Sequence, residues 1–178
     1  MVLSSCARQQ QEARQPVAES NASSMASDDE SDIFAEYKKT LSTPEEIKAL
    51  MEEWGVTFDI TGYTYLKGDK KGVFLSLGEV EQLEPYGLNF SVREKPNKDL
   101  REWILEDNLL VQEVGVVQTT VDGLPALRWA SYGLTQYDNV VVEHGDKIFL
   151  FTGDWNRGEN GDPNLNKLLE TVRFSSGL

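Results

Sequence analysis

Cysteine and histidine are almost absent from this chain, which has one of each, Cys6 and His144, among 178 residues. One cysteine excludes an intramolecular disulfide, and together with one histidine it cannot supply the four ligands of a usual zinc site. His144 falls at a predicted hairpin tip, where an imidazole seldom stands beside a nucleophile, so we expect no catalytic triad. The sequence also lacks phosphate-binding and dinucleotide-binding motifs. These absences predict a protein with no enzymatic chemistry and no transition-metal cofactor.

Basic residues are scarce, because 17 lysines and arginines stand against 30 aspartates and glutamates, for a net charge of −13. Phosphate backbones repel such a chain, and no basic patch is present to bind them, so we expect no nucleic-acid partner. The same charge disfavours direct adhesion to anionic lipid headgroups. No run approaches the roughly 20 apolar residues of a membrane-spanning helix. Attachment to a bilayer would therefore require a lipid on the protein.

The N-terminal residues Leu3-Ser4-Ser5-Cys6 resemble a bacterial lipobox, in which the cysteine receives a diacylglycerol and becomes the first residue of the mature protein. Polar neighbours argue against burial of Cys6, although an ordinary surface thiol stays an alternative. A secretory signal needs an apolar segment of about 7–15 residues before the cleavage site, and only Met1 to Ser5 precede this cysteine. We therefore expect either that residues 1–6 are the remnant of a lipoprotein signal and the natural chain begins earlier, or that the resemblance is accidental.

Residues 7–32 form a polar tract with no aromatic residue and only Val17 and Met25 as larger apolar side chains. Such a segment cannot bury enough apolar surface to offset the entropy lost on ordering, so it is predicted to be disordered. A flexible coil of about 26 residues would reach about 25–30 Å. Lipoproteins commonly carry such a tether, which favours the earlier start. All aromatic residues lie at or after Phe34, so we expect one globular domain over residues 33–178.

Helix and strand patterns begin at residue 33. Apolar spacing predicts a short helix over 33–41, and Thr43-Pro44-Glu45-Glu46 is a capping box that starts a helix ending at Gly55. A further helix is predicted over 98–108, with Asn97 as its cap. Alternating apolar residues predict strands at 56–60, 63–66, 73–77 and 88–92, with a hairpin turn at 67–72.

The second half of the sequence predicts hairpins. Strands at 116–121 and 124–129 flank Asp122-Gly123, a signal for a type I′ turn. Pro125 has no backbone N–H, which places it at a sheet edge or a strand start. Strands are then predicted at 138–143 and 147–152, and a closing helix at 165–172. The order of helix, strands, helix, four-stranded meander and helix predicts an α+β fold with an antiparallel sheet.

Four stretches carry a family resemblance. They are Gly123-Leu124-Pro125-Ala126-Leu127-Arg128-Trp129, Tyr137-Asp138-Asn139, Gly145-Asp146-Lys147-Ile148-Phe149-Leu150-Phe151 and Leu168-Leu169-Glu170-Thr171-Val172-Arg173-Phe174. Over roughly residues 56–174 the chain resembles the PsbP-like family, which includes the extrinsic photosystem II protein and many small bacterial lipoproteins. The resemblance implies an α/β/α sandwich around a central, mostly antiparallel sheet. It implies no catalytic residue, because this fold hosts docking proteins rather than a shared chemistry.

Loop 154–162 is the candidate for binding a hard cation, because oxygen-bearing side chains alternate there with two glycines. The candidate calcium ligands are Asp154, Asn156, Asn160 and Asp162. The loop departs from the EF-hand pattern at Gly158 and Leu165, so a plain polar connection is the alternative. Trp155 and Asn156 are candidate partner-binding residues, because aromatic side chains anchor interfaces.

These features predict a non-enzymatic, lipid-anchored accessory domain on the extracytoplasmic side of the bacterial cell envelope, docked to a protein or another envelope component. Two alternatives from other classes stay open. One is an envelope hydrolase that uses surface carboxylates, which requires two acidic groups facing one pocket. The other is a cytoplasmic adaptor of the same fold, in which Met1 is the true start and Cys6 is an ordinary thiol.

Overall fold

The computed structural model describes residues 41–63, 65–76, 87–107, 115–132, 136–154 and 161–175. Cys6 and the tract 7–32 lie outside these residues, as does nearly all of the helix predicted over 33–41. In the part of the chain that is described, no helix has the length and apolar character needed to cross a membrane. The helices are α2 (Pro44–Trp54), α3 (Leu100–Asp107) and α4 (Pro163–Thr171). The strands are β1 (Val56–Thr57), β2 (Tyr65–Asp69), β3 (Gly72–Ser76), β4 (Gly87–Glu94), β5 (Val117–Val121), β6 (Leu124–Tyr132), β7 (Gln136–His144), β8 (Lys147–Asp154) and β9 (Arg173–Phe174).

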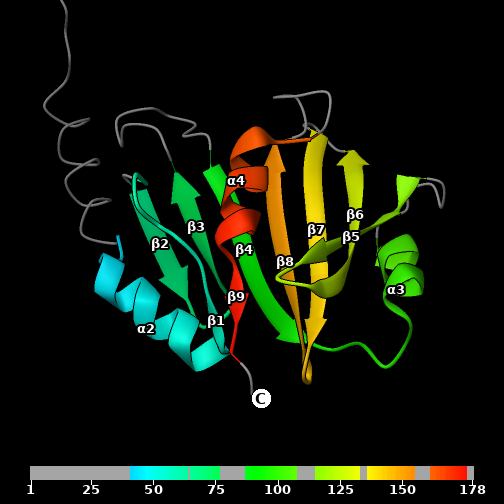
Figure 1. The fold of residues 1–178 in the computed structure, drawn as a ribbon, viewed down its shortest axis with the longest axis horizontal. Coiled ribbons are helices and arrows are strands. Elements are labelled where there is room, and N and C mark those ends of the chain that lie inside the picture. The colour runs from blue at the N-terminus through cyan, green and yellow to red at the C-terminus, as the bar shows by residue number, and fades with distance from the viewer. Residues whose placement is uncertain are drawn as a thin grey trace, which may run out of the picture.

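Seven strands form one sheet in the order β2-β3-β4-β8-β7-β6-β5, and all neighbouring strands are antiparallel (Figure 1). Strands β5 to β8 follow one another as the predicted four-stranded meander. The turn between β5 and β6 has positive φ at both Asp122 (50°) and Gly123 (77°), which confirms the predicted type I′ geometry. The fold of the described residues is therefore α+β with an antiparallel sheet, as the element order predicted.

Helix α2 begins and ends as its sequence predicts. Thr43 Oγ1 accepts a hydrogen bond from the N–H of Glu46 at 3.2 Å, and the Glu46 carboxylate accepts one from the N–H of Thr43 at 2.7 Å. Gly55 ends the helix in the left-handed conformation, at φ 73°, where a glycine has no steric cost. The buried side chains of the helix are Ile47, Met51 and Trp54.

Helices cover both faces of the sheet. Helices α2 and α4 share a hydrophobic core with Phe90 on one face, which we call the α2/α4 face. Helix α3 packs on the opposite face, the α3 face, where Ile104 is fully buried in a second core. The side chains of β7 alternate between the two cores, because Val140 and Val142 join the first and Val141 joins the second. The described residues therefore form three layers, and Figure 1 shows α2 and α4 together in front of the sheet.

The strand predicted at 56–60 is mostly wrong. Only Val56 and Thr57 are in a strand, and β1 pairs with the C-terminal β9 in a separate two-stranded sheet, with Val56 opposite Phe174. Phe58 and Ile60 are nevertheless buried in the core. Alternating burial produced the sequence pattern here, without the strand pairing that usually accompanies it.

The hairpin predicted before residue 78 is confirmed, with different bounds. Strand β2 continues to Asp69, and β3 begins at Gly72, so the turn is shorter than the predicted 67–72. Asp69 fixes this tight turn, because its Oδ1 accepts a hydrogen bond from the N–H of Lys71 at 2.7 Å.

Candidate binding site

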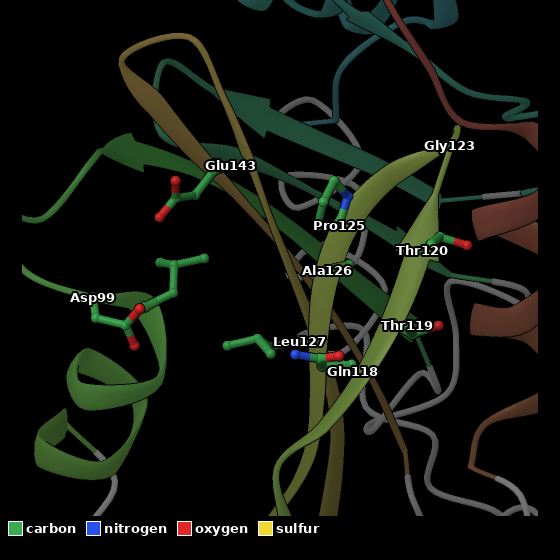
Figure 2. Close-up of a pocket in the computed structure, with 10 residues that line it drawn as sticks. Asp99, Gln118, Thr119, Thr120, Gly123, Pro125, Ala126, Leu127 and Glu143 are labelled. Atoms are coloured by element: carbon green, nitrogen blue, oxygen red, sulfur yellow. The ribbon is translucent and has the colours of Figure 1, made fainter.

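A hollow of about 830 Å³ lies on the α3 face, between the start of α3 and the β5–β6 hairpin, and we call it the α3-face hollow (Figure 2). Figure 2 shows Asp99 and Glu143 on one side of it and the hairpin residues across from them. Its volume falls within the range of about 300–1,000 Å³ that is typical of ligand sites. The lining residues are Asp99, Leu100, Gln118, Thr119, Thr120, Gly123, Pro125, Ala126, Leu127 and Glu143.

Asp99 borders the hollow because it caps α3. Its Oδ1 accepts hydrogen bonds from the N–H groups of Arg101 at 2.8 Å and Glu102 at 3.4 Å. A carboxylate is favoured at this position, because the unpaired N–H groups at a helix start carry partial positive charge. The prediction of Asn97 as the cap is therefore wrong, since the helix begins at Leu100, two residues later than 98.

Glu143 borders the hollow from the end of β7. Its Oε2 lies 2.7 Å from Nζ of Lys95, and the two side chains are 33% and 45% exposed, so the pair contributes at most about 1 kcal/mol to stability. The N–H of Lys95 donates to the carbonyl of Asp146 at 2.8 Å, which holds the segment after β4 against the β7–β8 turn. Among the described residues that line the hollow, the two charged ones are Asp99 and Glu143, and both are acidic.

The β5–β6 hairpin forms the opposite wall. Gln118 and Thr120 of β5 lie opposite Leu127 and Pro125 of β6. Leu127 packs against the core of the α3 face, so Gln118 and Thr120 present their side chains on that face as well. This wall thus combines amide, hydroxyl and aliphatic groups.

The tip of this hairpin is tied to the C-terminal strand. Asp122 Oδ2 accepts a hydrogen bond from the N–H of Phe174 at 2.8 Å, and Asp122 Oδ1 lies 3.8 Å from Nε of Arg173. These contacts link β5 and β6 to β9, which fixes the wall of the hollow from a distant part of the chain.

The α2/α4 face contains a buried ion pair that the sequence analysis missed. Arg128 Nε donates to Asp138 Oδ1 at 2.8 Å, and its Nη2 pairs with Asp138 Oδ2. The same Oδ2 accepts the N–H of Asp162 at 2.9 Å, and the Asp138 side chain is fully buried. The available signal was a charged residue within each of two apolar strands, since unpaired charges are almost never buried.

Asp162 connects this ion pair to α4. Its Oδ1 accepts the N–H of Asn164 at 2.8 Å as a helix cap, and its Oδ2 accepts the N–H of Asp154 at 2.8 Å. Gly161 is required beside it, because its φ is 86° and a Cβ would lie 2.1 Å from Nη2 of Arg128. The helix predicted from 165 therefore begins earlier, and the missed signal was Pro163 directly after a capping aspartate.

The predicted calcium ligands are only partly described. Asp154 and Asp162 have the backbone contacts given above, whereas Asn156, Asn160 and the candidate anchor Trp155 lie outside the described residues. Within the described ranges, no group of three or more His, Cys, Asp or Glu side chains is arranged to hold a metal. The calcium site and the binding role of Trp155 and Asn156 stay predictions, as does the lipid on Cys6.

His144 lies at the end of β7, next to the predicted hairpin turn. Its Nε2 is 3.1 Å from the carbonyl oxygen of Ser175, and its ring lies 5.1 Å from that of Phe174. Its contacts are therefore with the C-terminal segment, on the α2/α4 face, where Phe149 of β8 and Phe174 of β9 also pack.

Tyr63 lies at the edge of the α2/α4 core, beside the cap of α4. Burial raises the pKa of its phenol to about 12, and the negative charges of Asp162 and Asp59 add to this effect. A second hollow, of about 580 Å³, adjoins it between α2 and the segment after β1.

No protein-family model matches the chain, and no curated protein is significantly similar to it.

Proposed function

We propose that this protein is a non-enzymatic binding domain of PsbP-like type, held to the bacterial cell envelope by a lipid on Cys6, and that it docks a protein or another envelope component on its extracytoplasmic side. The α3-face hollow carries the docking part of this proposal. The three layers of the described residues support the PsbP-like part, because the resemblance implies helices on both faces of an antiparallel sheet.

The hollow supports binding more than chemistry because its acidic groups already have structural partners. Asp99 accepts hydrogen bonds from the first turn of α3, and Glu143 pairs with Lys95. The other described lining residues carry aliphatic, hydroxyl and amide side chains, which are typical of ligand-recognition sites.

Docking is tested by placing a photo-crosslinking amino acid at Gln118 of the full-length protein in membranes of its native cell. A matched control carries it at Glu45, an exposed residue of α2 on the opposite face. We expect an adduct of defined mass from position 118 and none from position 45. Equal adducts at both positions, or none at 118, would remove the hollow as the docking site.

The anchor is tested by fractionation. Expressed with a complete secretory signal, the wild-type protein is expected in the membrane pellet and the Cys6→Ser variant in the supernatant. Two acyl chains, at about 0.8 kcal/mol per buried CH₂, are enough for stable attachment. The same distribution for both proteins would refute the lipid anchor.

One observation favours the hydrolase as a second candidate: two carboxylates border the same hollow. The wild-type protein and the Glu143→Gln variant should therefore be compared on cell-envelope polysaccharides and peptides. The docking proposal predicts no turnover above the rate in buffer. Turnover by the wild type that Glu143→Gln abolishes would replace docking by hydrolysis.

A further inference from the structure

Strand β5 is an edge of the seven-stranded sheet and, among the described residues, pairs with β6 alone. Pro125 lies opposite Thr120 and has no N–H, so these two residues cannot exchange a pair of hydrogen bonds. Hydrogen-bonded and non-bonded pairs alternate along an antiparallel ladder. Gln118, two residues away opposite Leu127, is therefore also in a non-bonded pair. Both Gln118 and Thr120 thus direct their backbone N–H and C=O groups away from β6, toward the open edge.

The strand itself carries none of the residues that usually protect an edge against pairing with another chain. Natural proteins place lysine, proline, a bulge or an inward-pointing charge on such strands. Strand β5 reads Val117-Gln118-Thr119-Thr120-Val121, with no charge, no proline and no glycine, although the chain carries 47 charged residues, 17 basic and 30 acidic. Val117 is 52% exposed, and Tyr137 is the other exposed large hydrophobic side chain among the described residues. The sequence of β5 favours strand pairing.

The side chains beside this edge select the partner by charge. Gln118 and Thr120 face the α3-face hollow, whose described lining includes the carboxylates of Asp99 and Glu143. A strand added to β5 would present every second side chain on this face. Lysine or arginine at those positions would be attracted by the negative charge of the two carboxylates across the hollow, whereas acidic side chains would be repelled. On the opposite face, Val117 favours an apolar neighbour.

A second copy of this chain fits the edge poorly. Pairing two β5 strands would bring together two chains with a net charge of −13 each, and with them two sets of Asp99 and Glu143. Electrostatic repulsion opposes that arrangement and favours a basic partner.

We infer that β5 binds an extended segment of a partner protein as an added strand, with basic side chains at alternate positions facing the α3-face hollow and an apolar side chain facing Val117. This inference rests on the proposed docking function and names the chemistry of the partner. Backbone hydrogen bonds to Gln118 and Thr120 supply affinity, and the two carboxylates supply specificity.

The test uses a displayed library of random ten-residue linear peptides, selected on the full-length wild-type protein. We expect the recovered peptides to carry lysine or arginine at every second position. Thr120→Pro removes an outward N–H and leaves the ladder to β6 intact, so it should weaken peptide binding at least about tenfold. The matched variant Thr120→Val keeps the N–H and should bind within about twofold of wild type. Glu143→Gln should weaken binding about threefold to tenfold at low salt.

Amide hydrogen exchange gives a readout that does not depend on the proline variant folding. In the free protein the amides of Gln118 and Thr120 should exchange quickly, whereas that of Thr119, which faces β6, should be protected. A bound peptide should protect the first two. Unchanged exchange at Gln118 and Thr120 with a peptide bound would overturn strand addition.

Other outcomes separate this inference from the docking proposal. Recovered peptides without alternating basic residues, or a β5-dependent dimer that Thr120→Pro abolishes, would also overturn the inference. If the Gln118 crosslink persists in the Thr120→Pro variant, docking stands and strand addition fails. If neither the crosslink nor peptide selection succeeds, both proposals fail.

Discussion

The two faces of the sheet differ in how completely they are closed. On the α2/α4 face, two helices, an aromatic cluster around Phe90 and the Arg128–Asp138 ion pair cover the larger core, and the hollow at its edge, of about 580 Å³, is the smaller of the two. On the α3 face, one described helix covers a smaller core and leaves an open hollow beside the edge strand β5. Binding sites commonly occupy the less tightly packed part of a fold that a rigid part supports. We therefore assign stability mainly to the first face and recognition to the second.

The largest expected effect is the removal of the buried carboxylate on the closed face. Asp138→Ala removes the buried carboxylate that pairs with the Arg128 guanidinium and that accepts the N–H of Asp162. Breaking a buried ion pair in this way costs about 3–5 kcal/mol of unfolding free energy, measured by urea denaturation of the full-length protein. Asp138→Asn, which keeps one acceptor oxygen, should cost less. A loss below about 1 kcal/mol for Asp138→Ala would contradict the assignment of stability to this face.

A leucine pair compares the two faces directly. Leu165 of α4 is fully buried in the α2/α4 core, whereas Leu127 lines the hollow and is only partly buried. Leu165→Ala should cost about 2–5 kcal/mol through lost burial and a new cavity. Leu127→Ala should cost less than half as much, because its site already adjoins open space. Equal losses in the same denaturation experiment would show that the α3 face is packed as tightly as its opposite.

The local features of this fold could be predicted from sequence. The capping box of Thr43 and Glu46 and the Asp122-Gly123 turn depend on neighbouring residues, and both are present as predicted. The meander also follows from hairpin signals along the chain. The cap of α3 was harder, because Asn97 and Asp99 are both good capping residues; in the structure Asp99 caps the helix, and the next residue, Leu100, is buried.

The candidate site could not be predicted, because it depends on contacts between distant segments. The hollow joins the start of α3 to strands β5, β6 and β7, and its position depends on how α3 packs against the sheet. The ion pair of Arg128 and Asp138 likewise depends on the register between β6 and β7, which places the two side chains on one face. Neither leaves a short sequence motif, because the residues that form them come from segments far apart in the chain.

A pH experiment examines the closed face at its edge, where Tyr63 lies beside Asp162. The folded-state pKa of about 12 exceeds the ordinary value of 10.0, so the protonated phenol stabilises the folded protein. That contribution is complete below pH 10 and is lost as the pH rises from about 10 to 12. The wild type should therefore lose more stability over this window than Tyr63→Phe, in urea denaturation at each pH. Parallel curves for the two proteins would place Tyr63 in solvent.

The smallest effect on stability is expected on the open face, at the pair of Lys95 and Glu143. Both side chains are partly exposed, 45% and 33%, so Lys95→Ala should lower the unfolding free energy by only about 0.2–1 kcal/mol. Its effect on recognition has the opposite sign, because Lys95 competes with a basic ligand for the Glu143 carboxylate. The peptides selected on β5 should bind Lys95→Ala about threefold more tightly at low salt, and the gain should vanish at high salt. Weaker peptide binding by this variant, with its stability unchanged, would show that Lys95 is itself part of the binding surface and that Glu143 does not attract the ligand.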